Sequence, residues 1–404
     1  MQSKSHRQKS ALAVSCTAHI VQDGLSATIY VLLPVLAQSF GLTYTQVGLF
    51  KGLKSLAQAA LEMCSGIAAE WIGELRVIVF GLALSGVGYA GLAFAPSVLF
   101  MLVCLVVIGA GTAFQHAPAS ALIVTAYPID ARRGPLGLYN SSGDIGKLIF
   151  TGGFSIAIGA GLAWQNISFI FGLAALVAAI AIALFRQAFE KLQQSETAPN
   201  QDGSDDGSHL GWGILHWRTY CTLLTVVFFD TMVQAGVLVF VAFLLLSKGL
   251  PLAIATMATV IVLIGGIFGK AGCGFLADRL GVRPAFVLIQ VLTAIGLICI
   301  ALAPGWYAML LLLPLGVVVQ GSTSITYGFA ADLIHPRRMA RGYALLYSSS
   351  SFSSVAGPLV FGLFADTFGI EIAMYAMAIV ALLAVPPIAF LPTTSAQQPT
   401  TASV

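Results

Sequence analysis

Charged residues are scarce in this chain of 404 residues: Asp, Glu, Lys and Arg make up only 9% of it, whereas 58% of its residues are hydrophobic. A soluble protein needs more charge than this to cover its surface, so a soluble globular fold is excluded. Polar stretches are few, and apolar runs of about 18 or more residues recur, each long enough to cross a bilayer. We predict an all-α membrane protein of about twelve transmembrane helices. The predicted spans lie near residues 12–38, 44–69, 77–95, 97–126, 135–160, 163–186, 219–247, 251–276, 284–303, 305–331, 342–365 and 371–391.

Several functional motifs are also missing. The sequence contains no HExxH, no GxSxG and no Walker loop, so we do not expect a membrane-embedded enzyme. Its six cysteines show no CxxC or other ligand spacing, and we predict free thiols in the core, with no metal and no cofactor. A net charge of +3 does not suggest nucleic-acid binding.

The few Lys and Arg residues are unevenly distributed. If the N-terminus is cytoplasmic, 14 of the 19 lie at cytoplasmic ends or loops, and the outer loops keep only Lys248. Positive loops of membrane proteins stay on the cytoplasmic side. We therefore predict a multi-pass protein of the cell inner membrane with both termini in the cytoplasm. The basic start imitates a signal peptide, but Asp23 interrupts the following run, so we predict an uncleaved first span.

The two halves of the sequence resemble each other. The segment GIAAEWIGELR (66–76) matches GFLADRLGVR (274–283), and PIDARRGPLGLY (128–139) matches PRRMARGYALLY (336–347). Both matches have the same offset, 208 residues. Chance seldom gives one offset in two separated segments, and two parallel six-span repeats are typical of a rocking transporter.

The longest polar stretch divides the spans six and six. It is rich in Gly, Ser, Asp and Gln, as a cytoplasmic linker should be. The predicted parts are an N-terminal six-helix bundle (1–186), the linker (187–216), a C-terminal six-helix bundle (217–391) and a cytoplasmic tail (392–404).

The repeated loops carry a family resemblance. Their glycine, acid, glycine and arginine resemble the signature loop of the major facilitator superfamily: GKAGCGFLADRLGVR is a good copy, whereas GIAAEWIGELR is degenerate. Within that superfamily, HIVQD with LPVLAQSFGLTYTQVGL, GAGTAFQHAPAS and RRGPLGLYNSSGDIGK resembles the fosmidomycin resistance protein group. The resemblance covers nearly the whole chain. It implies two pseudo-symmetric bundles around a central cavity, which the first, second, fourth and fifth spans of the first half would face.

Polar residues line one face of those same spans, since residues three or four apart share a helix face. The stripes are Cys16, His19, Asp23, Ser26 and Tyr30; Lys51, Lys54, Gln58 and Glu62; Thr112 and His116; and Asn140, Asp144, Lys147 and Thr151. A charge near mid-bilayer costs at least ~2.5 kcal/mol if it faces lipid. We therefore expect these groups to face one another or a wet cavity.

Asp23 is the predicted proton carrier, with His19 one turn away as modulator. Burial in a low-dielectric cavity favours the protonated form of a carboxylate, so such a group can bind and release a proton near neutral pH. The alternative is a permanent structural pair of His19 and Asp23. Asp144 is a second candidate carrier, or else it is locked to Lys147 as an internal ion pair.

The substrate is predicted to be anionic. Lys54 is the first candidate to attract it, with Lys147 and Lys51, although Lys51 could instead extend toward the outer face. The remaining predicted substrate contacts are Tyr30, His116, Asp230, Gln234, Gln320, Tyr327 and Tyr347. For His116 the alternative is a core histidine bonded to a backbone carbonyl.

A cytoplasmic gate is implied by the resemblance. Its members would brace the cytoplasmic helix ends when the protein opens outward; the alternative is that their positive charge only sets the orientation. They are Glu70, Arg76, Arg133, Asp278, Arg279, Arg283 and Arg341.

The predicted function is a proton-coupled secondary transporter that works by alternating access. Export of a small organic anion or zwitterion, phosphonate-like or carboxylate, is implied by the resemblance. Uptake by symport is the alternative, and a non-transporting sensor or scaffold is an alternative of another class. The expected partners are the substrate, protons and the lipid bilayer, and we expect a monomer.

Overall fold

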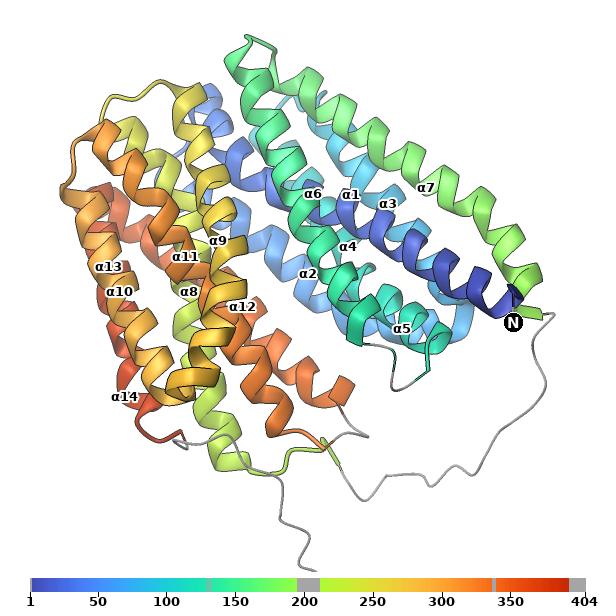
Figure 1. Cartoon of the computed structure of the whole chain (residues 1–404). Helices are drawn as coiled ribbons and strands as arrows, with labels where there is room; N and C mark the ends of the chain where they lie inside the picture. Colours follow the sequence, from blue (N-terminus) through green and yellow to red (C-terminus); the bar gives the residue numbers. More distant parts are fainter. Residues whose placement is uncertain (1, 129–130, 132, 195–210, 336–338, 392–404) are drawn as a thin grey trace, which may run out of the picture. The chain divides into compact units, whose positions relative to one another are not determined.

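The computed structural model describes residues 2–128, 131, 133–194, 211–335 and 339–391, and this part of the chain is nearly all helical (Figure 1). An isolated bridge joins Ile214 to Ile334. The helices are α1 Gln2–Phe40, α2 Tyr44–Ile72, α3 Glu74–Leu92, α4 Val98–Ala113, α5 His116–Ala126, α6 Arg133–Gly159, α7 Trp164–Gln194, α8 Trp217–Ser247, α9 Leu252–Leu280, α10 Val282–Leu302, α11 Gly305–Asp332, α12 Met339–Phe368, α13 Ile370–Leu383 and α14 Val385–Ile388.

Ten helical segments in the described ranges are long and apolar enough to cross a membrane. The prediction of an all-α membrane protein is confirmed. The other two predicted spans, 44–69 and 135–160, are α2 and α6, continuous helices of 29 and 27 residues. Both are long enough to span a membrane, but their polar stripes give them a lower mean hydropathy than the other ten spans.

The predicted span 97–126 is broken in two. Helix α4 ends at Ala113 and α5 begins at His116. Pro118 has no backbone N–H to continue the ladder to the carbonyl of Phe114, so a break at this point is expected. The break places His116 at the first turn of α5. The last predicted span is likewise divided into α13 and α14, where Pro386 and Pro387 follow the break.

The start of α2 is specified by its own sequence. Thr43 and Gln46 form a capping box, in which the backbone N–H of Gln46 donates to Thr43 Oγ1 at 3.3 Å and that of Thr43 donates to Gln46 Oε1 at 2.9 Å. Two N–H groups that the helix leaves without partners are satisfied in this way.

The helices fall into two compact units. One comprises residues 1–203 with 251–260, and the other residues 204–250 with 261–404. In the first unit α1 packs against α6, α3 against α7 and α2 against α4. In the second, α8 packs against α11, α12 and α13, while α10 packs against α11 and α13 (Figure 1).

Helices α1 and α6 touch through glycine. A Cβ atom at Gly146 would lie 2.1 Å from the carbonyl oxygen of Ile20, and one at Gly143 would lie 2.5 Å from the His19 ring. Only glycine allows two helix backbones to approach this closely. The polar stripe of α6 is thereby brought against that of α1.

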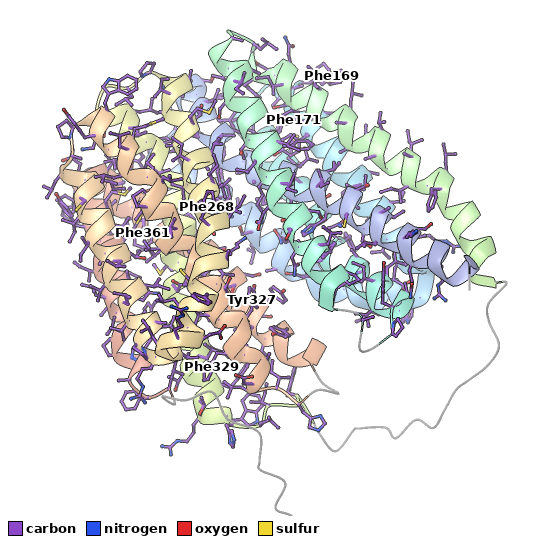
Figure 2. All side chains as sticks on the ribbon, viewed as in Figure 1. Phe169, Phe171, Phe268, Tyr327, Phe329 and Phe361 are labelled. Carbon is purple, nitrogen blue, oxygen red and sulfur yellow. The ribbon has the colours of Figure 1, made fainter. Side chains whose placement is uncertain are left out.

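Apolar side chains fill the units and also cover their outsides. The first unit buries a cluster that includes Ala18, Leu82 and Ile123. The aromatic rings of Phe150 and Phe171 meet at 4.9 Å between α6 and α7, and Figure 2 labels Phe171. Large apolar side chains also stand on the outside, for example Leu184 and Leu310, which are 70% and 73% exposed. Such a surface suits a lipid environment.

The six cysteines are free. Cys104 and Cys273 are buried, but Cys64, Cys221 and Cys299 are exposed, so the prediction that all six lie in the core is wrong for these three. Their helices present them outward, where a thiol behaves as a small apolar group.

Candidate functional site

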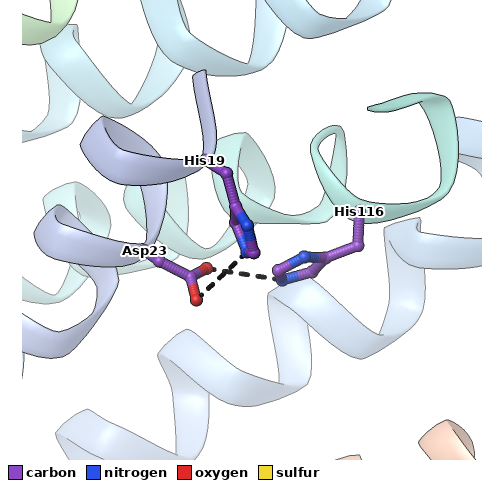
Figure 3. Close-up of side chains that lie close together, drawn as sticks. All are labelled: His19, Asp23 and His116. Carbon is purple, nitrogen blue, oxygen red and sulfur yellow. Dashed lines mark ion pairs between the residues drawn. The ribbon is translucent and has the colours of Figure 1, made fainter. Parts of the chain in front are cut away.

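The carboxylate of Asp23 is the centre of the polar cluster in the first unit. Asp23 lies on α1 and is 7% exposed. Its Oδ2 atom lies 3.3 Å from His19 Nε2 and 3.2 Å from Lys147 Nζ of α6, while its Oδ1 atom lies 3.6 Å from His116 Nε2 of α5. Figure 3 shows His19 and His116 directed at this carboxylate. Polar stripes from α1 and α6 and the first turn of α5 meet here.

His19 is held in one orientation by Tyr139. Its Nδ1 atom lies 2.7 Å from the backbone carbonyl of Tyr139, and its ring stacks on the Tyr139 ring at 4.1 Å with an interplanar angle of 17°. Since a carbonyl only accepts, Nδ1 must carry a hydrogen. In neutral His19 the Nε2 atom would then face Asp23 with a bare lone pair.

The contact between His19 and Asp23 therefore needs a proton. A lone pair on Nε2 and a carboxylate oxygen at 3.3 Å repel each other. The contact becomes a hydrogen bond when His19 is an imidazolium or when Asp23 is a carboxylic acid. The geometry of this pair is that of a site for one shared proton.

Lys147 bridges two carboxylates. Its ammonium lies 3.2 Å from Asp23 Oδ2 and 3.1 Å from Asp144 Oδ1. The side chains of Lys147 and Asp144 are 29% and 21% exposed. The internal pair that their spacing predicts is present, and the same ammonium also neutralises Asp23.

The donor atoms of His19, Asp23 and His116 lie within 4.8 Å of one another and could hold a metal ion. Two imidazoles and a carboxylate form a typical transition-metal ligand set. However, the Lys147 ammonium already contacts Asp23 Oδ2 at 3.2 Å and places a positive charge where a metal cation would bind. Coulomb repulsion opposes a second cation there. The expectation of no metal stays a prediction.

Two further lysines are buried on α2. Lys51 and Lys54 are 4% and 2% exposed. Lys54 Nζ donates to Ser26 Oγ at 2.6 Å and to Gln58 Oε1 at 2.9 Å. In the described residues, the hydrogen-bond partners of these lysines are neutral, although Asp23 and Glu62 attract the Lys54 ammonium from further away. Burying a cation without a counter-charge in contact is costly.

Lys51 points along α2 away from the start of that helix. Its Nζ atom donates to Ser55 Oγ at 2.6 Å and lies 5.2 Å from the centre of the Tyr30 ring. A cation at this distance from an aromatic ring is attracted to it. The ammonium is therefore held between α1 and α2, and this geometry does not support the alternative that Lys51 extends toward the outer face.

The second unit contains a separate buried acid. Asp230 accepts hydrogen bonds from Gln234, Gln290 and Ser322 at 2.7–2.8 Å. The sequence singled out Asp230 and Gln234 but missed the other two. Gln290 could have been noticed, because it is the one Gln in the apolar run 284–303.

Tyr327 and Tyr347, two of the predicted substrate contacts, lie together. Their ring centres are 5.7 Å apart, and Tyr343 completes the group, with its hydroxyl donating to the carbonyl of Tyr327 at 2.8 Å. Tyr347 is 48% exposed, and Figure 2 labels Tyr327. Gln320 lies on α11, and within the described ranges its buried Nε2 atom has no hydrogen-bond partner.

The predicted cytoplasmic gate is described only in part. Arg283 donates to the carbonyl of Leu391, and the guanidinium of Arg279 lies 4.3 Å from the ring centre of Phe275. Arg76 and Asp278 are exposed near the ends of α3 and α9. The side chains of Glu70, Arg133 and Arg341 lie outside the described structure, so the network stays a prediction.

Gln22 is a buried polar residue that periodicity missed. Its Nε2 atom donates to Ser85 Oγ at 2.7 Å and to Thr112 Oγ1 at 3.1 Å, which ties α1 to α3 and α4. Gln22 precedes Asp23 in the chain, and adjacent residues lie about 100° apart around a helix. It therefore falls off the predicted stripe, and only its presence in HIVQD could have drawn attention to it.

Parts of this chain are similar in sequence to known transporters. Over 102 residues it is 32% identical to YfnC of Bacillus subtilis, an uncharacterized transporter of the major facilitator type. This match covers 25% of each chain. The chain is 23% identical over 278 residues to the probable sulfoacetate transporter SauU of Cupriavidus necator, 67% of this chain and 64% of that protein. The first match thus spans 25% of the length of YfnC, and the second spans 64% of the length of SauU.

A solved structure resembles the fold over nearly its whole length. It is the crystal structure of a bacterial homolog of the human lysosomal transporter Spinster, in an inward-facing and unoccupied conformation. The TM-score is 0.77, the sequence identity is 16%, and the match covers 95% of this chain and 96% of that one. This likeness concerns the fold alone.

A family profile decides the assignment. The profile of the Major Facilitator Superfamily matches residues 16–270 and again residues 223–404. Together these matches include all of the second unit, the first unit from residue 16 onward and every residue of the Asp23 cluster. Proteins of this family and fold are secondary transporters of small molecules and not enzymes. The chain therefore belongs to the major facilitator superfamily and is a multi-pass membrane protein.

Proposed function

We propose that this transporter is driven by protons and exports a small organic anion or zwitterion by alternating access. The observation that carries the proposal is the geometry of Asp23: one buried carboxylate contacts His19, His116 and Lys147 at 3.2–3.6 Å. The contact with His19 requires a proton between the two groups, and we propose that this proton is exchanged during transport. A transporter needs such a group if proton movement is to drive transport.

Proton binding at the His19–Asp23 pair would change the affinity of the Lys147 ammonium for an anion. While Asp23 is ionised, Lys147 lies between two carboxylates. Protonation of Asp23 removes one of these charges, so the ammonium gains affinity for an anionic substrate; binding of proton and anion together in this way would give symport, the alternative to export. Export by antiport requires instead that the proton and the anion bind to this cluster alternately. This linkage supplies the differential interaction that a population shift requires.

The charge of the substrate follows from the buried lysines. In the described residues of the first unit, Lys147 contacts Asp23 and Asp144, and Lys54 is attracted to Asp23 and Glu62, whereas the charged neighbour of Lys51 is another lysine, Lys54. Lys51 and Lys54 have neutral partners in the described residues. An anion bound nearby would supply the missing counter-charge. The name of one relative, a probable sulfoacetate transporter, and the resemblance to the fosmidomycin resistance group both support a sulfonate, phosphonate or carboxylate.

The other assignments remain part of the proposal. Tyr30, His116, Gln234, Gln320, Tyr327 and Tyr347 are proposed substrate contacts. Glu70, Arg76, Arg133, Asp278, Arg279, Arg283 and Arg341 are proposed to brace the cytoplasmic helix ends. The two bundles are proposed to be joined by the cytoplasmic linker, with both termini in the cytoplasm of an inner-membrane monomer.

The test is proton movement in proteoliposomes that contain the purified full-length protein and a fluorescent pH probe. Fosmidomycin, sulfoacetate and small carboxylates are added in turn to wild type, Asp23→Asn and Asp144→Asn. We expect an anion-driven proton flux that Asp23→Asn abolishes, while Asp144→Asn keeps part of it because Lys147 retains Asp23. Proton flux that persists in Asp23→Asn would contradict the proposed coupling site.

The direction of the flux separates the alternatives. Protons that move against the added anion indicate antiport and export, whereas protons that move with it indicate uptake by symport. If all anions are silent while cations drive flux, the buried lysines only neutralise aspartates and the proposed substrate class is wrong. Absence of flux with every solute, in protein that remains folded, would favour a sensor.

A further inference from the structure

Asp230 occupies a cage of neutral hydrogen-bond donors in the second unit. It lies near the middle of α8 and is 6% exposed. Its Oδ2 atom accepts from Gln234 Nε2 and from Ser322 Oγ, both at 2.8 Å. Its Oδ1 atom accepts from Gln290 Nε2 at 2.7 Å. Both oxygens are thus engaged by donors on α8, α10 and α11, which leaves this carboxylate little room for a substrate.

No counter-charge accompanies this carboxylate in the described ranges. The ion pairs found there do not include Asp230, and its hydrogen-bond partners are an amide on α8, an amide on α10 and a hydroxyl on α11. The charged side chains of the helices around it lie at or near helix ends: Arg218 on α8, Lys248 directly after α8, Arg283 on α10, Asp332 on α11, Asp366 on α12 and Glu371 on α13. Arg341 of α12 has its side chain outside the described part.

Several of these charged side chains contact groups other than Asp230. Lys248 contacts Glu371 at 3.8 Å, and Arg283 donates to the carbonyl of Leu391. The tyrosines of α11 and α12 contact one another. An ionised carboxylate in this position would be held by neutral dipoles alone, a state that burial disfavours relative to the acid.

The cage can accept a proton without moving its backbone. Ser322 Oγ also lies 3.4 Å from the carbonyl oxygen of Val319. If Oδ2 of Asp230 is protonated, its O–H donates to Ser322 Oγ, and the serine hydroxyl turns toward Val319. If Oδ2 is ionised, the hydroxyl turns back and donates to it. A hydroxyl is the donor that can reverse in this way, because it both donates and accepts.

We propose that Asp230 is a second proton-binding residue of this transporter, and that rotation of the Ser322 hydroxyl accommodates the proton. The proton is taken up from water at Oδ2 and returned to water; no covalent bond other than O–H forms or breaks. This site lies wholly in the second unit. It is therefore separable from the Asp23 cluster, and neither proposal depends on the other.

Infrared difference spectroscopy tests the proposal directly. The purified full-length protein in lipid nanodiscs is acidified stepwise, and the C=O stretching band of protonated carboxyl groups is followed. We expect Asp230→Asn to lose the contribution of one carboxyl group. Asp23→Asn and Asp332→Asn should keep that contribution. Asparagine retains the acceptor oxygen of aspartate, so the variant preserves much of the cage. A band that Asp230→Asn leaves unchanged would overturn the proposal.

A second variant decides the matter if Asp230→Asn fails to fold. Gln290→Leu removes a donor that stabilises the carboxylate, so the band assigned to Asp230 should appear at higher pH than in wild type. Leucine has nearly the volume of glutamine, and Gln290 Oε1 has no hydrogen-bond partner in the described residues, so this change removes few other interactions. An unshifted band in folded Gln290→Leu would refute the assignment to Asp230.

Discussion

Replacing Gly146 by alanine tests whether the α1–α6 contact holds the Asp23 cluster together. The added Cβ would lie 2.1 Å from the carbonyl oxygen of Ile20 and 2.7 Å from its Cα and carbonyl carbon, whereas ordinary contacts begin at 3.4 Å. These are backbone atoms, which cannot move to another rotamer. The two helices must therefore separate locally by about 1 Å, as an overpacked core does.

The expected loss of stability can be worked out. Overpacking costs about 1–3 kcal/mol, while glycine to alanine in a helix gains about 0.5–1 kcal/mol. The net destabilisation relative to wild type is therefore about 0–2.5 kcal/mol. Gly153→Ala is the matched control on α6, because a Cβ there meets nothing within 4 Å. Gly153→Ala should show only the stabilisation of about 0.5–1 kcal/mol that alanine gives in a helix.

Separation of α1 and α6 would also disturb the Asp23 cluster. Lys147 directly follows Gly146, and its ammonium contacts Asp23 at 3.2 Å. Displacement by about 1 Å would stretch this contact beyond the 4 Å within which an ion pair is effective. Gly146→Ala should therefore lower both the thermal stability and the proton-coupled transport, whereas Gly153→Ala should lower neither.

The assays are thermal unfolding of the purified protein in detergent and proton flux in proteoliposomes. A change of 1 kcal/mol moves Tm by roughly 2–4 °C in domains of 150–250 residues. We therefore expect Gly146→Ala to unfold several degrees below Gly153→Ala. If Gly146→Ala proves as stable as Gly153→Ala, the α1–α6 packing argued from these glycines is refuted.

Three further predictions follow from other contacts. Lys54→Gln should weaken binding of an anionic substrate tenfold or more, since a charge-assisted hydrogen bond contributes about 1.5–3 kcal/mol; equilibrium binding checks this, with exposed Lys9→Gln as the control that stays unchanged. Thr43→Ala should cost about 1 kcal/mol by removing the cap of α2, which Thr43→Ser should largely restore in a thermal melt. A chelator should leave transport intact because Lys147 supplies the positive charge at Asp23; inhibition by chelation, reversed by added zinc, would instead show a metal site.

The sequence predicted the fold class and most members of the cluster. Apolar runs and the internal repeat determined the helices, because hydropathy and periodicity are local properties of the chain. The stripes were visible for the same reason: His19 and Asp23 are one turn apart on α1, and Asp144 and Lys147 are one turn apart on α6. Spans 44–69 and 135–160, which became α2 and α6, were predicted from their apolar runs, although their mean hydropathy is lower than that of the other ten spans.

Other features depend on contacts that no local pattern contains. The break between α4 and α5 places His116 against Asp23, and the contact of His19 Nδ1 with the Tyr139 carbonyl sets which nitrogen of His19 faces that carboxylate. Gln290, isolated in an apolar run, became meaningful only when it was found against Asp230.

By itself, the sequence determined which residues could carry charge into the membrane and which helix face each would occupy. The tertiary structure decided which of these charges meet. Lys147 contacts Asp23 because Gly143 and Gly146 let two backbones approach closely, while Lys51 and Lys54 find neutral partners on α1 and α2. Helical spacing fixes neighbours within one helix, but pairing across helices depends on the shapes that pack, and those shapes exist only in the folded protein.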